Sequence, residues 1–422
     1  MNPSLVARRI QRLVEKHHKL RANSLNMSPS ENVTSWALRA IVASDFMHRY
    51  GICDRRDIER RWEGNIYINE VEKIVQELAK RLFDVEYVDL RPISGHIATL
   101  SALGAFAKAG STVFETAGEN GGHGFYNLPD SVPIVDYRPE FFPFDTTEWN
   151  IDVDSTAKRI RQAKPSVLIF GSSFYLFPSP IRDLRPVADE VGAAILCDEA
   201  HVLALIAGKQ WPNPLSEGAH VFTASTHKTF PGPQKGIVMT NSVTCVEKVA
   251  KIISTGLQSN HHLMNVAALG YGLAEMLQYG KVYAKQMVNN ARALGAALAD
   301  EGFEVVGEHK GFTRSHQVLI KTDSYVPAPQ VSRLLEKSGI FANRMELHDA
   351  NGVRTGTNEL TRIGMKESDM KEVARFYREV VIDKRDPREV ARRVRAFVSD
   401  FRKLQYSFDA GKNPYSTPRF FE

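Results

Sequence analysis

Short apolar segments that alternate with amphipathic helical stretches limit most strongly how this chain can fold. Four such segments stand at residues 166–171, 193–198, 220–225 and 236–240, and each ends at a loop containing Gly, Ser, Asp or Asn. Apolar runs of this length predict strands that are buried on both faces. In parallel sheets, functional sites gather at the loops that follow the strands. The pattern therefore predicts a layered α/β domain with a mostly parallel central sheet.

Amphipathic stretches surround these segments and continue beyond them. In the first part of the chain, apolar residues at helical spacing predict helices over residues 70–83 and 99–108. Later in the chain we expect helices at residues 283–300, 329–338, 368–382 and 387 to about 404. Short strands are expected at residues 303–306 and 317–321. We therefore expect an N-terminal helical arm (residues 1–25), a large domain (26–280) and a smaller α+β domain (281–422).

The charge and the cysteine content indicate which partners and which cellular compartment to expect. The formal net charge is +5, but Lys and Arg are spread along the chain without a basic stripe, which argues against a nucleic-acid partner. Three cysteines in 422 residues cannot build a disulfide framework and favour a reducing compartment. No segment reaches the ~20 apolar residues of a membrane span. We expect a cytoplasmic protein with no membrane partner and no metal.

The strongest chemical signal follows the third predicted strand. Lys228 comes directly after Ser225, Thr226 and His227, and a Pro- and Gly-rich turn follows at residues 231–236. Burial at the end of a strand disfavours the ammonium form of a lysine and lowers its pKa. The neutral amine that results is what a Schiff-base lysine needs. Taken alone, the pattern also fits an ordinary loop lysine, so the neighbouring motifs decide between the two.

Asp198 and His201 come directly after the second predicted strand. A carboxylate at that edge can pair with a pyridinium nitrogen, which keeps the ring of a cofactor electron-withdrawing. The simpler alternative is a helix N-cap. The order of this pair, one further strand and then Lys228 favours the catalytic interpretation.

Three more motifs offer polar groups to a cofactor and a substrate. Ser94, Gly95 and His96 stand at a predicted strand-to-helix junction, where free backbone N–H groups suit a phosphate. A Gly-Gly pair precedes His123, whose imidazole can stack on a planar ring. Arg354 lies late in the chain, and its guanidinium can bind a substrate carboxylate with two hydrogen bonds. An exposed ion pair is the alternative for Arg354.

Taken together, this ordered set of motifs resembles the serine hydroxymethyltransferase family of fold-type I pyridoxal-phosphate enzymes. The match extends from Ser-Glu-Asn-Val-Thr-Ser at residues 30–35 to Arg354 and Thr361-Arg362. The resemblance implies an aspartate-aminotransferase-like α/β fold, pyridoxal phosphate as the cofactor, and a homodimer or dimer of dimers whose chains share their active sites.

The resemblance also implies roles for individual residues. Lys228 would carry the cofactor, Asp198 would pair with the pyridine nitrogen, His201 would lie beneath the phenolic oxygen, and His123 would stack on the ring. The other expected cofactor-binding residues are Ser94, Gly95, His96, Ser173, Ser225, His227, Ser259 and Asn260. Arg354 and Ser30 would bind the substrate carboxylate, and Tyr50 would reach into the site of a partner subunit.

Departures from the family pattern narrow the expected reaction. Folate-dependent members place a glutamate two positions after the family tyrosine, as an acid/base in the one-carbon step. This chain has Ile52 there, and an isoleucine cannot transfer a proton. Residues 226–236, 257–260, 312–318 and 406–409 instead resemble L-threonine transaldolases. That branch cleaves threonine by a retro-aldol reaction and adds the bound glycine carbanion to another aldehyde without folate.

Three functions are compatible with these observations. The favoured one is a pyridoxal-phosphate enzyme of the aldol type, which makes or breaks the Cα–Cβ bond of a β-hydroxy-α-amino acid through a glycine quinonoid. Glu31 is the first candidate for the base at the β-hydroxyl, and His123 is the second. The alternative is folate-dependent hydroxymethyl transfer from serine or α-methylserine, although Ile52 argues against tetrahydrofolate as a second cofactor. A minor alternative is a cofactor-binding protein that has lost catalysis.

Overall fold

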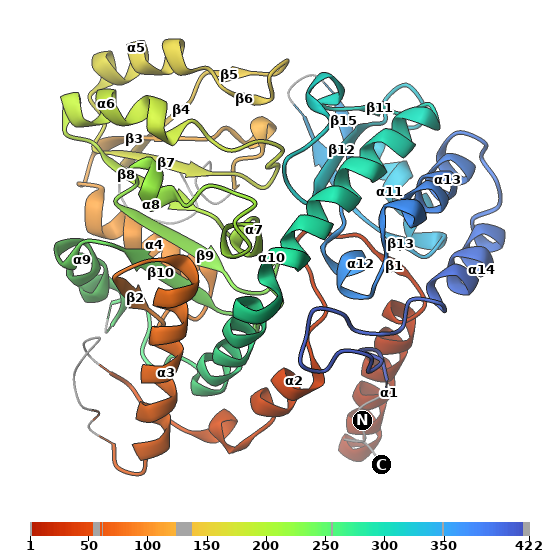
Figure 1. Ribbon diagram of the computed structural model, residues 1–422, viewed down its shortest axis with the longest axis horizontal. Helices are drawn as coiled ribbons and strands as arrows, with labels where there is room; N and C mark the ends of the chain where they lie inside the picture. The colour runs from red at the N-terminus through yellow and green to blue at the C-terminus, as the bar shows by residue number, and fades with distance from the viewer. Residues whose placement is uncertain are drawn as a thin grey trace.

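A seven-stranded sheet forms the centre of the larger of two lobes (Figure 1). The computed structural model describes residues 2–53, 60, 62–123, 137–254, 256–347 and 350–416. The strand order is β2-β10-β9-β8-β7-β3-β4, and within this sheet β10 alone runs against its neighbours. The strands are β2 (Tyr87–Asp89), β3 (Ser111–Glu115), β4 (Tyr137–Phe141), β7 (Val167–Gly171), β8 (Ala194–Asp198), β9 (Val221–Ser225) and β10 (Gly236–Thr240). The predicted mostly parallel sheet and its four apolar strands are confirmed.

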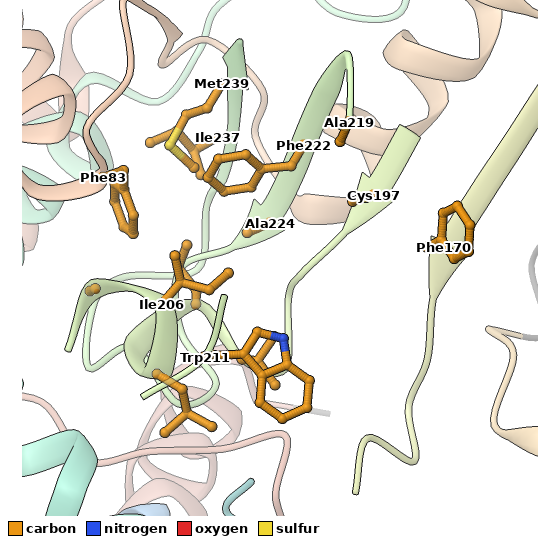
Figure 2. Close-up of a cluster of buried hydrophobic side chains, with 14 of the residues drawn as sticks. Phe83, Phe170, Cys197, Ile206, Trp211, Ala219, Phe222, Ala224, Ile237 and Met239 are labelled. Atoms are coloured by element: carbon orange, nitrogen blue, oxygen red, sulfur yellow. The ribbon is translucent and has the colours of Figure 1, made fainter. Parts of the chain in front are cut away.

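Helices cover both faces of this sheet, which explains why its strands are continuously apolar. On one face lie α4 (Gly95–Phe106) and α9 (Val243–Ile253), and on the other lie α3 (Ile66–Phe83), α5 (Val153–Ala163), α6 (Ile181–Val191) and α7 (Leu203–Ala207). Figure 2 shows the core of the second face, where Phe222 of β9 points towards Phe83 and Ile206 lies nearby. Each such fully buried side chain contributes roughly 1.5–3 kcal/mol. The sheet is therefore a rigid support for the loops at its edge.

The smaller lobe is built on a four-stranded antiparallel sheet of order β11-β12-β15-β14. Its strands are β11 (Glu304–Val305), β12 (Gln317–Lys321), β14 (Asn343–Glu346) and β15 (Asn351–Gly356). Its helices are α11 (Ala328–Lys337), α12 (Asn358–Arg362), α13 (Met370–Val381) and α14 (Pro387–Val398). Near the N-terminus, β1 (Leu25–Asn26) pairs with β13 (Ile340–Phe341), so Leu25 is part of the core of the smaller lobe.

One helix of 38 residues, α10 (Leu263–Asp300), runs between the two lobes (Figure 1). It packs on α3 in the larger lobe and on α13 in the smaller one. The predicted helix began only at residue 283, because glycines in the first half weaken the helical signal. Gly270 is required by packing, since a Cβ there would lie 2.5 Å from Val75 Cγ2. The predicted domain boundaries near residues 25 and 280 remain a proposal. Helix α10 continues through residue 280 without a break.

The N-terminal helix and the last described residues lie beside the smaller lobe (Figure 1). Helix α1 (Pro3–Arg21) buries none of its residues and leads to α2 (Trp36–Val42). At the other end, α14 ends at Val398 and not near residue 404 as predicted. The reason is that Leu404 is buried and its amide donates to Lys412 O at 2.9 Å, which turns the chain back. Within the described residues, no helix is long and apolar enough to cross a membrane.

Candidate active site

The N-terminus of α4 lies against the end of β9 at the edge of the large sheet. Ser94 caps this helix, because its Oγ accepts a hydrogen bond from the Ile97 amide at 3.2 Å. Gly95 is required there, since a Cβ would lie 2.1 Å from Ser225 Oγ and 2.9 Å from Ser225 N. The helix therefore begins at Gly95, at the expected strand-to-helix junction, whereas the apolar periodicity of the sequence begins only at residue 99. Its first N–H groups form an anion-binding cradle next to β9.

Asp198 is held firmly at the end of β8. Its Oδ2 accepts a hydrogen bond from Thr99 Oγ1 at 3.0 Å, and its Oδ1 accepts one from the Ala200 amide at 3.1 Å. Thr99 also lies 2.8 Å from Thr223 Oγ1 on the neighbouring strand. Thr99 was not predicted as a site residue, because nothing in its local sequence places it beside a carboxylate more than ninety positions away.

Lys228 follows β9 in a tight turn. Thr226 sets this turn, because its hydroxyl donates to Pro233 O at 2.7 Å and its amide donates to Lys235 O at 3.0 Å. Burial lowers the pKa of Lys228 to about 8; nearby Asp198 opposes this shift and nearby Arg354 adds to it. Roughly one tenth of Lys228 is therefore the neutral amine at pH 7, far more than for an exposed lysine, and this is the form that Schiff-base formation requires.

Several histidines gather around this lysine. His201 is buried, and its ring stacks on that of His316 at a centroid distance of 6.1 Å and an interplanar angle of 17°. Burial, with Lys228 and Arg354 nearby, holds the pKa of His201 well below its usual range, so the ring is neutral. The rings of His96 and His123 lie 5.7 Å apart. The stacking of His123 on a cofactor ring remains a proposal.

Arg354 is a buried cation on β15. It donates hydrogen bonds to Ser173 O, to Ser30 Oγ at 3.0 Å and to Asn343 Oδ1 at 3.2 Å, and Phe174 lies beside it. No carboxylate in the described part of the chain pairs with it, and its Nε is enclosed without a hydrogen-bond partner. Burial lowers its pKa to about 10, so the guanidinium stays charged at neutral pH. A buried cation of this kind is suited to an anionic substrate group.

Other predicted residues lie in two further places. Tyr50 is 46% exposed, and its hydroxyl contacts Ser259 Oγ at 3.1 Å, while Asn260 Oδ1 accepts from the Gly51 amide at 3.2 Å. No contact within the described residues joins Tyr50 to Lys228 or Arg354.

Glu31 borders the entrance to the site. Its half-exposed carboxylate pairs with Arg21. It also lines a cavity of about 470 Å³ together with Ser30 and His227. The Nδ1 atom of His227 is enclosed without a hydrogen-bond partner, and burial lowers the pKa of that ring to about 4.

A second buried lysine, Lys235, joins two chain segments next to the site. Its Nζ donates to His261 O at 3.0 Å and to Pro92 O at 3.4 Å, which ties together the segments before α4 and before α10. His261 in turn contacts Glu72 Oε1 at 2.5 Å. Burial lowers the pKa of Lys235 to about 7, although the nearby Glu72 and Asp89 oppose the shift. Sequence reasoning did not select this residue.

We expect replacement of Lys235 with methionine to reduce the pH dependence of stability. Between about pH 7 and the ordinary lysine pKa of 10.5, the unfolded chain holds a proton that the folded chain has lost. Raising the pH through this window therefore stabilises the wild-type fold. Below about pH 7, Lys235 is charged although it is buried, and the full cost of burying that charge lowers the free energy of unfolding. Melting temperatures at the two ends of the window should differ less in Lys235→Met. Exposed Lys251→Met is the matched control, and an unchanged difference in Lys235→Met would contradict the prediction.

The residues around Lys228 fit pyridoxal phosphate. The glycine-dependent cradle at α4 suits the phosphate, the fixed carboxylate of Asp198 suits a pyridinium nitrogen, and the buried amine of Lys228 suits an imine. Within the described residues, no group of His, Cys, Asp and Glu is arranged to hold a metal ion.

Comparisons with known proteins agree with this fit. The family model described as Serine hydroxymethyltransferase matches residues 5–377. The chain is 44% identical to a serine hydroxymethyltransferase of Thermococcus gammatolerans, over 96% of this chain and 97% of the relative. It is 40% identical to that of Methanopyrus kandleri, over 97% of both chains. An L-threonine transaldolase from Pseudomonas fluorescens superposes with a TM-score of 0.90 at 29% identity, covering 96% of this chain and 94% of that one.

These matches cover almost the whole chain and both lobes. They confirm the predicted fold, the cofactor and the enzyme class, and they argue against a chain that has lost catalysis. The protein therefore belongs to the serine hydroxymethyltransferase family of pyridoxal-phosphate-dependent enzymes.

Proposed function

We propose that this enzyme makes and breaks the Cα–Cβ bond of a small β-hydroxy-α-amino acid by aldol chemistry. The observation that carries the proposal is Arg354, a buried guanidinium without a carboxylate partner in the described chain and close enough to Lys228 to lower the pKa of that lysine. An amino acid whose carboxylate binds Arg354 and Ser30 Oγ would have its α-carbon near the lysine.

The residues divide the work between them. Bound pyridoxal phosphate supplies an electron sink for negative charge at the α-carbon. Asp198, held by Thr99, would keep a proton on the ring nitrogen. Arg354 and Ser30 would bind the substrate carboxylate and so fix the orientation of the substrate beside Lys228. The neutral amine of Lys228 can accept or return a proton near the α-carbon.

Glu31 and His123 remain the two candidates for the base at the β-hydroxyl. Glu31 is favoured because it follows Ser30, a ligand of Arg354, and because it lines the cavity at the entrance. To act there, its carboxylate must leave Arg21. His123 lies beside His96 and close enough to Lys228 and Asp198 for their charges to influence its pKa.

A second candidate function is hydroxymethyl transfer from serine to a reduced pterin such as tetrahydrofolate. The relatives from Thermococcus gammatolerans and Methanopyrus kandleri favour it, because both are named serine hydroxymethyltransferase and are 44% and 40% identical to this chain. Ile52 argues against it, since the position lacks an acid/base group. The two functions share the cleavage of the Cα–Cβ bond. In hydroxymethyl transfer the pterin takes up the one-carbon unit of serine. In the aldol reaction the first aldehyde is released and a second aldehyde is added to the glycine unit.

The discriminating experiment uses purified enzyme loaded with pyridoxal phosphate. We expect acetaldehyde to be released from L-threonine without pterin, and an added aromatic or aliphatic aldehyde to be converted into a new β-hydroxy-α-amino acid. Turnover of L-serine that requires tetrahydrofolate, together with no cleavage of threonine, would establish the second function instead. α-Methylserine belongs in the same panel, because it tests an α-substituted substrate.

We also propose a cytoplasmic homodimer, or a dimer of dimers, with shared sites. Tyr50 is exposed and does not contact Lys228 of its own chain, as expected for a residue that acts in a partner's site. Helix α1 exposes Leu5, Ile10 and Leu13, each more than half accessible, which leaves apolar surface for a second copy. The three cysteines are buried and none is joined in a disulfide, in keeping with a reducing compartment.

A further inference from the structure

We propose that Gln317 is a positioning residue that holds the ring proton of His201 on Nε2, so that His201 presents an N–H group to the cofactor site. The inference rests on the proposed function in one respect, namely that pyridoxal phosphate binds beside His201. It adds a residue from the smaller lobe to a site that otherwise depends on the end of the large sheet.

The contact between the two side chains is enclosed and crosses from one lobe to the other. Gln317 is the first residue of β12 and is completely buried, and its Nε2 lies 3.2 Å from His201 Nδ1. Its backbone is fixed by a hydrogen bond from its amide to Ser315 Oγ at 3.0 Å and by pairing with Gly356 on β15. His316 stacks on the imidazole of His201 and limits its rotation.

The orientation of the amide decides which ring nitrogen carries the proton. With Nε2 of Gln317 facing the ring, the amide donates and His201 Nδ1 accepts, so the single proton of a neutral imidazole must be on Nε2. The reverse orientation would turn both amide N–H groups to the place where Oε1 now lies without a partner. Enclosed unpaired N–H groups are rarer in proteins than enclosed unpaired carbonyl oxygens, so the first orientation is favoured.

The groups around His201 decide whether its ring is charged or neutral. The groups whose charges act most on the ring are Lys228, Arg354, His316 and His123, and none of these four is an anion. Burial and the two cations hold the ring neutral, so it has one N–H group to direct. His201 Nε2 makes no hydrogen bond within the described residues and is left to donate to a ligand. An N–H donor at this place stabilises an anionic oxygen on the cofactor.

The test is a double-mutant cycle on the cofactor-loaded enzyme without substrate. The readout is the pH midpoint at which the absorbance of the lysine-bound cofactor changes, because that midpoint reports how well an anionic ring oxygen is stabilised. Gln317→Met removes the amide while nearly keeping side-chain volume, and we expect the midpoint to rise by roughly 1 pH unit. In a His201→Leu background, the same substitution should leave the midpoint unchanged.

Controls separate this role from packing and from the proposed reaction. Leu319→Met, a volume-conserving change on the same strand, should leave the midpoint as in the wild type. If Gln317→Met does not fold, Gln317→Asn tests the loss of the hydrogen bond to His201 Nδ1. The asparagine side chain is one methylene shorter, so its amide does not reach the ring. An unchanged midpoint, or equal shifts in both backgrounds, would overturn the inference. Since no substrate is used, failure of the aldol assay would leave this result intact.

Discussion

Replacement of Lys228 with alanine is expected to abolish the absorbance of the lysine-bound cofactor and to lower kcat by at least about 10³-fold. The variant loses both the amine that holds the cofactor and the group that can move a proton at the α-carbon. Pyridoxal phosphate should still bind without a covalent bond, because the cradle at Gly95 and the Asp198–Thr99 pair are unchanged. Reduction with borohydride followed by peptide mapping measures the covalent attachment directly.

The matched control for this experiment is Lys251→Ala, an exposed lysine on α9. Its spectrum and activity should equal those of the wild type. Retention of the full absorbance band in Lys228→Ala, or a borohydride label on another lysine, would refute the assignment. The buried Lys235 is the residue to inspect first in that case, because its pKa is also depressed.

Replacement of Arg354 with lysine should reduce kcat/KM for the amino-acid substrate by about 10²–10³-fold, or roughly 3–4 kcal/mol. A lysine retains the charge but cannot reproduce a planar pair of hydrogen bonds to a carboxylate. It would also leave Ser173 O and Ser30 Oγ without their present donor. The loss should fall mainly on KM, whereas the cofactor absorbance should persist because Lys228 and Asp198 are untouched.

Arg344→Lys provides the comparison for this second substitution. Arg344 lies on the neighbouring strand β14 but is half exposed and faces Glu346 at 4.0 Å, so its replacement should change kcat/KM little. Equal effects of the two substitutions would show that Arg354 does not bind the substrate. Loss of cofactor absorbance in Arg354→Lys would instead assign the arginine to the cofactor.

The elements that sequence patterns predicted well are those whose burial is uniform. Strands β7, β8, β9 and β10 agree with the predictions to within one residue, because a strand covered on both faces must be apolar throughout. Helix ends were predicted less well. The start of α4 depends on how closely Gly95 approaches Ser225, and the end of α14 depends on the bond from Leu404 to Lys412. Both contacts join segments that are distant in sequence.

Local patterns were sufficient to select the cofactor chemistry: a lysine, an aspartate, a helix start suited to phosphate and an arginine stand in an order that implies pyridoxal phosphate. Asp198 and Lys228 were recognisable because polar residues mark the ends of apolar strands, whereas Arg354 lies within β15 and was selected from the resemblance to the family. The side chains that support these residues became visible only in the folded chain. Thr99 reaches Asp198 across the sheet, and Gln317 reaches His201 from the other lobe. Such partners lie about one hundred positions apart, and hydrogen bonds of that kind leave no periodicity in a sequence.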